Sequence, residues 1–184
     1  MSARVFDPLR LDVQAFAGDA GELSGHWPLC QFERLADMLH GDAPVADGDL
    51  ITWSVRGEQR AARCTPAQSW LHLEARATLK LECQRCLQPV TTELALDRWF
   101  HFVPGEDAAA QLDTDSEDDV LALTRALDLR ELVEDELLLA LPLVPRHAVC
   151  PEPLLAPGES QDMEADPVHP FAALAALKQG GRLN

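Results

Sequence analysis

A chain of 184 residues with 47% hydrophobic residues is long enough to bury a core, and its apolar runs fall short of a membrane span. The formal net charge of −16 argues against tight binding to nucleic acid, because that affinity comes largely from Lys and Arg side chains on phosphates. Five cysteines, an odd number, and an N-terminus without the apolar region of a signal peptide indicate a cytoplasmic protein without a disulfide framework.

The N-terminal quarter contains one clear helical pattern. Residues 4–16 mix apolar and polar side chains without a period, and we expect an extended piece and a helical turn. Glycines at positions 18, 21 and 25 are then expected to interrupt regular structure. In residues 31–40 the apolar side chains recur at helical spacing, which predicts a helix that Gly41 ends.

The strand signals lie between residues 50 and 103. Residues 50–55 are typical of a strand, and Gly57 is expected to turn the chain into a second strand over residues 61–64. From residue 71 to 83 every odd position is apolar or small and most even positions are polar, which predicts a strand with one buried face. Another long strand, residues 90–103, follows. We expect this hairpin to organise the fold and its short links to favour antiparallel pairing.

The segment after the hairpin is strongly acidic. Residues 104–136 contain twelve Asp and Glu against two Arg, whereas residues 56–98 contain seven Lys and Arg against five acids. Residues 105–119 are rich in small and acidic residues, and we expect a mobile loop there, followed by a short edge strand over residues 120–123. Residues 128–141 predict a helix that Asp128 caps, in a capping box with Glu131, and that Pro142 ends.

The composition changes again after Cys150, to Pro, Gly, Glu and Asp. This change predicts a flexible acidic linker, and the apolar spacing after Pro170 predicts a short helix over residues 170–178. We therefore expect one α+β domain over residues 1–150, an antiparallel sheet or partial barrel built around the hairpin, with the helix at 128–141 packed on it. Residues 151–184 would form the linker and the short helix, which docks either on its own domain or on a partner.

The pair Cys83-x-x-Cys86 lies where the hairpin reverses, and it allows three interpretations. Two thiolates in a tight turn are able to share a zinc ion, with His147 and Cys150 as candidates for the remaining ligands. A redox pair is the second, although redox Cys-x-x-Cys motifs usually lie at a helix N-terminus and this one lies between strands. The third, a hairpin end without metal, is favoured because the second Cys-x-x-Cys of a zinc ribbon is missing.

Other candidate residues favour structural roles. The run Glu134-Asp135-Glu136 suggests acid–base or metal chemistry, but a solvated helix face explains it better. Histidines and tryptophans at strand positions are expected to pack on the sheet, namely His72, His101, Trp53, Trp70 and Trp99. The sequence contains no phosphate-binding glycine loop, nucleophile elbow or dinucleotide fingerprint. These observations favour a protein that is not an enzyme.

Three stretches in series resemble the YceD family of large ribosomal RNA subunit accumulation proteins. They are residues 81–90, residues 132–145 with His147 and Cys150 after them, and residues 170–178. Their motif residues in this chain are Cys83, Arg85, Cys86, Pro89, Glu134, Asp135, Glu136 and Pro142. The resemblance covers residues 5–178 and implies a role in the synthesis, processing or stability of large-subunit ribosomal RNA, without assigning catalytic residues.

One departure from the family bears on the metal. Some relatives carry further Cys-x-x-Cys pairs near the C-terminus, whereas this chain keeps only Cys150 there, which weakens the zinc interpretation.

The resemblance and the charge together favour a function in which the chain binds another protein. A chain this acidic would bind a basic ribosomal protein or assembly factor through residues 106–136. Direct contact of the hairpin with ribosomal RNA is the alternative, through Arg76, Lys80, Arg85 and Arg98. An RNA-processing enzyme is the least supported of the three.

Overall fold

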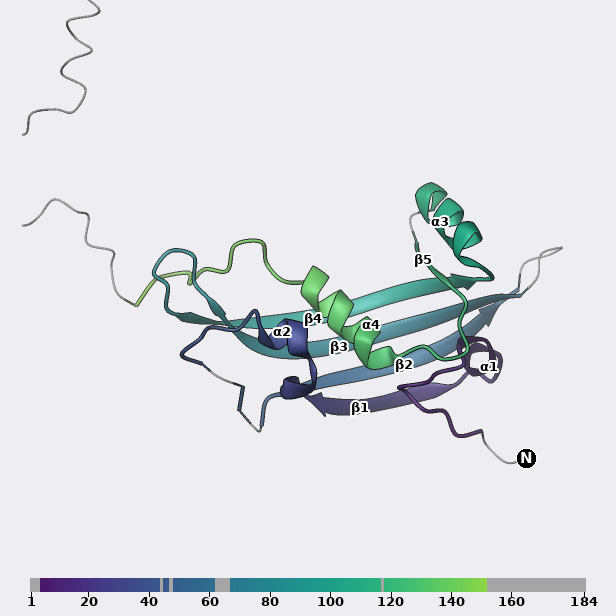
Figure 1. Cartoon of the computed structure of the whole chain (residues 1–184), viewed down its shortest axis with the longest axis horizontal. Helices are drawn as coiled ribbons and strands as arrows, with labels where there is room; N and C mark the ends of the chain where they lie inside the picture. Colours follow the sequence, from purple (N-terminus) through teal and green to yellow (C-terminus); the bar gives the residue numbers. More distant parts are fainter. Residues whose placement is uncertain (1–3, 44, 47, 62–66, 117, 152–184) are drawn as a thin grey trace, which may run out of the picture. The chain divides into compact units, whose positions relative to one another are not determined.

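A five-stranded sheet forms one layer of the fold in the computed structural model, which describes residues 4–151 except 44, 47, 62–66 and 117 (Figure 1). The strands lie in chain order: β1 (Glu22–Pro28), β2 (Leu50–Arg60), β3 (Gln68–Glu82), β4 (Pro89–Val103) and β5 (Asp119–Ala122). The first four pair antiparallel, and β5 adds in parallel to β4. Since β1 and β5 remain at opposite edges, the expected α+β class is confirmed but the sheet stays open rather than closing into a partial barrel.

The predicted hairpin is confirmed and is the longest pairing in the sheet. β3 and β4 pair in an unbroken register from Ser69 opposite Phe102 to Glu82 opposite Pro89. Along β3 the odd positions are buried and most even positions are exposed, as the alternation predicts. The register therefore sends one continuous apolar stripe, which includes Leu71, Leu73 and Leu79, to a single face of the sheet.

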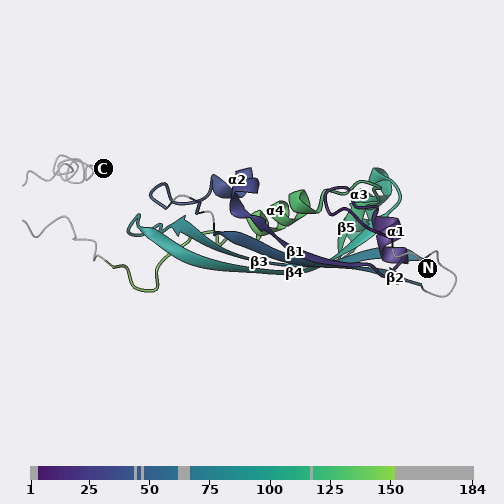
Figure 2. The ribbon, with the colours of Figure 1, turned by 90° about the horizontal axis from the view of Figure 1, so that it is seen from below.

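The helices cover that apolar face. They are α1 (Val13–Gly18), α2 (Glu33–Ala36) with the 3₁₀ turn Leu29–Gln31 before it, α3 (Glu106–Asp115) and α4 (Leu129–Leu139). Figure 2 shows all four on the same side of the curved sheet, and the opposite side carries no helix in the described residues. Phe16, Phe32 and Leu137 point into the space between the layers and are fully buried there. A two-layer fold with one open sheet face results.

Two of the glycine-based predictions are wrong, for the same physical reason. Gly57 lies inside β2 rather than in a turn, and Gly25 lies inside β1, a strand that the sequence analysis missed. A Cβ atom at position 57 would lie 2.8 Å from the Cα atom of Ala17, and one at position 25 would lie 3.0 Å from the indole of Trp53. Glycine in a strand here permits close approach of a neighbouring element. Of the second strand expected after Gly57, over residues 61–64, residues 62–64 lie outside the described residues.

The remaining segments agree in part with the sequence. The helix at 128–141 is confirmed as α4, and Asp128 accepts hydrogen bonds from the N–H groups of Arg130 and Glu131. The helix expected over residues 31–40 is reduced to the 3₁₀ turn and the four-residue α2. The loop expected over residues 105–119 is wrong, because α3 forms there, and the edge strand after it is confirmed as β5. The short helix at 170–178 lies outside the described residues.

Among the described residues, no helix is both long enough and apolar enough to cross a membrane.

Replacing Gly57 by Ala should destabilise the fold, because the new methyl group would meet the backbone of α1. Overpacking of this kind costs roughly 1–3 kcal/mol. Urea unfolding measures the loss, with Gly48→Ala as the matched control, since a Cβ at Gly48 meets no atom within 4 Å. Equal stability of the two variants would show that α1 does not pack against β2 as described.

Candidate functional site

The hairpin tip is a tight turn between the last residue of β3 and the first of β4. The N–H of Cys83 donates to the carbonyl of Gln88 (3.0 Å), and the N–H of Leu87 donates back to the carbonyl of Cys83 (2.8 Å). Leu87 takes a left-handed conformation, with φ of 58°, which is uncommon for a residue other than glycine. His40 holds this residue from outside, because its Nε2 lies 2.9 Å from the Leu87 carbonyl oxygen.

The chain after α4 returns to this tip. The N–H of Gln84 donates to the carbonyl of Pro145 (2.9 Å), and the N–H of His147 donates to the Sγ of Cys83 (3.5 Å). The His147 ring also reaches β4, where its Nε2 lies 3.1 Å from the carbonyl oxygen of Pro89. Residues 58 to 64 positions apart in the sequence are thus joined by direct hydrogen bonds.

This return brings four potential metal ligands together. The ligand atoms of Cys83, Cys86, His147 and Cys150 all lie within 4.8 Å of one another. The Sγ of Cys86 lies 3.4 Å from the Nδ1 of His147, and Cys83 has no exposed surface. The same four residues were candidate ligands from the sequence, but only the fold shows that they lie close together.

The surroundings of Cys83 favour a thiolate. Burial opposes ionisation of its thiol, but the backbone N–H groups of His147, Arg85 and Cys86 outweigh burial and lower the pKa to about 5. For Cys150, burial and the two neighbouring thiols act together and raise the pKa. A redox cysteine must be reached by its substrate, and the buried sulfur of Cys83 is not. The cluster is therefore better suited to binding an ion than to thiol exchange.

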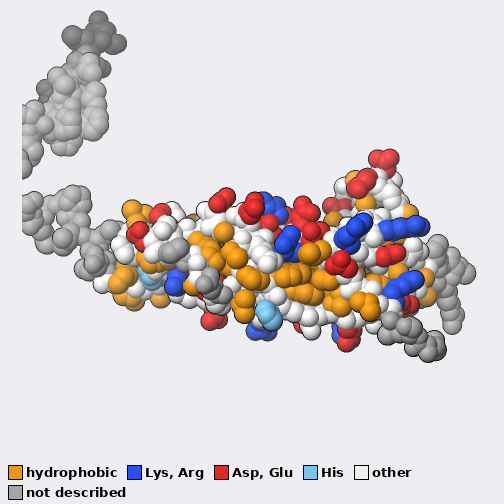
Figure 3. Space-filling model, turned by 60° about the horizontal axis from the view of Figure 1, so that its bottom comes forward, with side chains coloured by type: hydrophobic (Ala, Val, Ile, Leu, Met, Phe, Trp, Pro, Cys, Tyr) orange, Lys and Arg blue, Asp and Glu red, His pale blue; other side chains and the backbone are white. Residues whose placement is uncertain are grey.

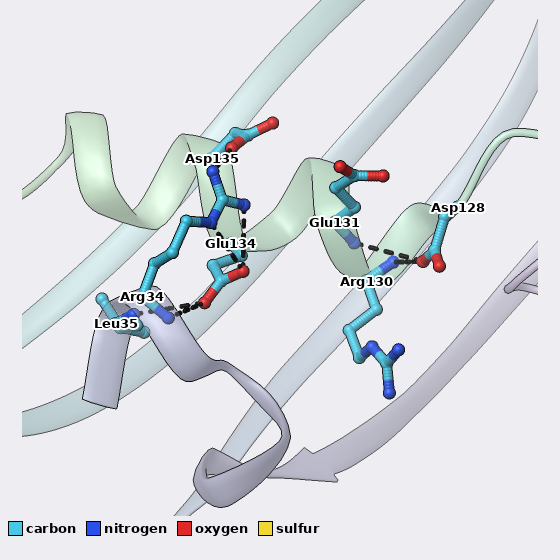
Figure 4. Close-up of polar contacts among 7 residues, drawn as sticks. All are labelled: Arg34, Leu35, Asp128, Arg130, Glu131, Glu134 and Asp135. Atoms are coloured by element: carbon cyan, nitrogen blue, oxygen red, sulfur yellow. Dashed lines mark hydrogen bonds and ion pairs between the residues drawn. The ribbon is translucent and has the colours of Figure 1, made fainter. Parts of the chain in front are cut away.

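The carboxylate run on α4 has a different role from the one expected. Glu134 is buried, and Figure 4 shows it facing the N-terminus of α2. Its Oε1 accepts hydrogen bonds from the N–H groups of Arg34 (2.9 Å) and Leu35 (3.1 Å), and its Oε2 accepts from the Arg34 guanidinium (2.9 Å). Phe32, the residue at the N-cap of α2, has no side chain able to accept these bonds. Glu134 thus caps a helix about one hundred residues before it.

The other two carboxylates of the run, Asp135 and Glu136, differ in exposure and in partner. Asp135 is half-exposed and pairs with Arg34, whereas Glu136 is buried with its carboxylate 3.8 Å from the guanidinium of Arg98. Burial raises the pKa of Glu136, and Arg98 opposes that rise. The expected solvated face is therefore wrong for Glu134 and Glu136. Nothing in the local sequence reveals this, because their partners lie on α2 and β4.

The other motif residues frame these contacts. Pro89 begins β4, Arg85 is exposed in the turn, and Pro142 follows α4 by three residues. The strand histidines pack across the sheet as predicted: His72 stacks on Trp99 with ring centroids 4.4 Å apart, and His101 stacks on Trp70 at 4.5 Å. The guanidinium of Arg60, a residue that no sequence motif singles out, lies over the rings of both tryptophans.

Two groups stand out among those of the twelve acidic residues of 104–136 that the structure describes. One group has internal partners, such as Asp128 at its cap, Asp119 on Arg98 and Glu134 on α2. The other group lies on and beside α3, and we name it the acidic patch: Glu106, Asp107, Asp113 and Asp118, all exposed. Figure 3 shows red side chains at the end of α3, at the upper right.

Comparison with known proteins found a matching family and a curated relative. The family model of "Large ribosomal RNA subunit accumulation protein YceD" matches residues 71–178. A curated relative of the same name from Haemophilus influenzae is 36% identical over 177 residues, which cover 94% of this chain and 96% of the relative. No solved structure matches the chain.

Replacing Glu134 by Ala should destabilise the protein, because it leaves two N–H groups of α2 and the Arg34 guanidinium without their acceptor. We expect a loss of about 2–3 kcal/mol in the free energy of unfolding. The control is Glu131→Ala on the exposed side of the same helix, where the change should stay within about 0.5 kcal/mol. If both variants unfold at the same urea concentration, Glu134 does not cap α2.

Proposed function

Since the chain belongs to the YceD family of large ribosomal RNA subunit accumulation proteins, we propose that it supports the accumulation of large-subunit ribosomal RNA by binding a basic ribosomal protein or assembly factor. The family's name describes an accumulation factor rather than an enzyme, and the proposed role is not enzymatic. The observation that carries the proposal is the acidic patch on and beside α3.

The patch is available to a partner. Its four carboxylates are exposed, and none of them forms an ion pair with another described residue. Ala109 is the buried anchor of α3, which places Glu106 and Asp107 on the solvent side of the helix. Asp113 also accepts a hydrogen bond from the N–H of Val120, which fixes α3 to β5. The helix α3 is therefore a rigid support for a cluster of like charges.

Charge determines the kind of partner. Four carboxylates on one helix and its link, without an ion-pair partner among the described residues, attract a positively charged surface and repel phosphate groups. The chain's net charge of −16 acts in the same direction at longer range. A basic protein of the large subunit fits this surface, and association with it should weaken as salt shortens the range of the attraction.

Direct binding of ribosomal RNA by the hairpin has less support. Arg76, Lys80 and Arg85 are exposed, but Arg98, the fourth cation of that hypothesis, pairs with Asp119 (3.5 Å) and lies beside Glu136. On β3 the exposed carboxylates of Glu74 and Glu82 flank Arg76 and Lys80. This mixture of charges offers no continuous track for a phosphate backbone.

Neutralising the acidic patch should weaken binding to large-subunit ribosomal proteins. The variant Glu106→Gln, Asp107→Asn, Asp118→Asn removes three negative charges, and we expect its dissociation constant to rise about tenfold at low salt, or roughly 1.4 kcal/mol. Binding is measured with purified ribosomal proteins of the large subunit at increasing salt. Wild-type binding should fall as salt rises.

The matched control is Glu22→Gln, Glu82→Gln, Glu93→Gln, which removes the same charge from exposed strand positions. The control should bind like the wild type. Equal weakening of both triple variants would assign the effect to net charge alone. Retention that ignores salt, or binding to protein-free ribosomal RNA instead of protein, would contradict the proposal.

A further inference from the structure

We propose that Cys83, Cys86, His147 and Cys150 hold a structural Zn²⁺ ion that fastens the hairpin tip to the chain after α4. This inference concerns the fold of the tip and does not rest on the ribosomal partner. It stands on the geometry of the four side chains, on the hydrogen bonds around them, and on the shape of the turn that carries the first two cysteines.

The ligand set matches zinc. Three sulfurs and one imidazole nitrogen, all within 4.8 Å of one another, need only small side-chain movements to surround one ion. In a tetrahedral site with Zn–S of about 2.3 Å and Zn–N of about 2.0 Å, a sulfur and a nitrogen ligand lie about 3.5 Å apart. The Sγ of Cys86 and the Nδ1 of His147 are 3.4 Å apart. Thiolates also select zinc over magnesium, calcium or manganese.

The hydrogen bonds outside the ligand atoms are those of a prepared metal site. The Nε2 of His147 faces the carbonyl oxygen of Pro89, so the proton of a neutral ring lies on Nε2 and the lone pair lies on Nδ1, which faces the cysteines. The Sγ of Cys83 accepts a hydrogen bond from the backbone N–H of His147 (3.5 Å), which fixes this sulfur beside the returning segment. The ring of His147 and the sulfur of Cys83 are thus both oriented within the cluster before any ion enters.

The turn between the cysteines supports the same conclusion. Leu87 follows Cys86 directly and holds a left-handed conformation that a side chain disfavours. Such strain persists only where its surroundings impose it. The hydrogen bond from Leu87 to the Cys83 carbonyl folds the chain back, and this places the two thiols of Cys83 and Cys86 side by side.

Four protein ligands leave no open position, so the site is structural rather than catalytic. Its two halves come from the hairpin turn and from the segment after α4, which no helix or strand of the described residues otherwise connects at this point. An ion shared by both halves would hold the segment against the tip.

The test is zinc binding by the purified full-length chain, stripped of metal under reducing conditions. Zinc is titrated in competition with a chromogenic chelator, and native mass spectrometry counts the bound ions. We expect one zinc ion per chain. His147→Ala and Cys150→Ser should weaken binding by about 100-fold or more, since each removes a direct ligand. Cys30→Ser, which changes an exposed cysteine outside the cluster, should bind zinc like the wild type.

A separate measurement on the unaltered chain keeps the test valid if a variant does not fold. Cobalt in place of zinc should give the intense visible absorption of a tetrahedral site and sulfur-to-metal charge-transfer bands. Failure of the wild type to take up zinc, or full affinity in Cys150→Ser and His147→Ala, would overturn the proposal. A chain isolated two hydrogen atoms lighter, with Cys83 joined to Cys86, would also overturn it.

Discussion

The register of the β3–β4 hairpin is the constraint on which the other elements depend. A shift of one residue would send the apolar stripe of β3 to solvent and its charged residues under the helices. A fifteen-residue strand extends roughly 50 Å, whereas the eleven residues of α4 extend only about 16 Å. A helix of this length covers only part of the hairpin, and the tip is held by other contacts. Cys83, Cys86 and the returning segment with His147 and Cys150 stand at that place.

The helix layer has its own long-range link, and it explains part of the chain's acidity. Glu134 supplies the cap that Phe32 is unable to supply for α2, and its charge is balanced by Arg34. Acids that look alike in the sequence thus serve two purposes. Glu134 and Asp135 of α4 hold α2 in place through Arg34, whereas the acidic patch on and beside α3 remains exposed to solvent.

Local patterns predicted much of this structure, and contacts between distant residues account for the rest. The hairpin and α4 follow from periodicity and capping, which neighbouring residues determine. β1 was missed because Gly25 looks like a breaker, although its missing side chain makes room for Trp53. The acid run was misread because the partner of Glu134 lies on another helix. The candidate metal ligands were predicted from the sequence. Their proximity depends on the segment after α4 folding back to the hairpin tip, which no local pattern predicts.

The hairpin would then be stabilised in two separate parts, its middle by apolar burial and its tip by the proposed zinc ion. Hydrogen exchange of the full chain, compared with zinc bound and after chelation, tests this most directly. We expect faster exchange at residues 83–88 and 145–149 once the metal is removed, with residues 71–77 unchanged. Identical exchange at the tip in both states, or loss of protection along the whole hairpin at once, would contradict it.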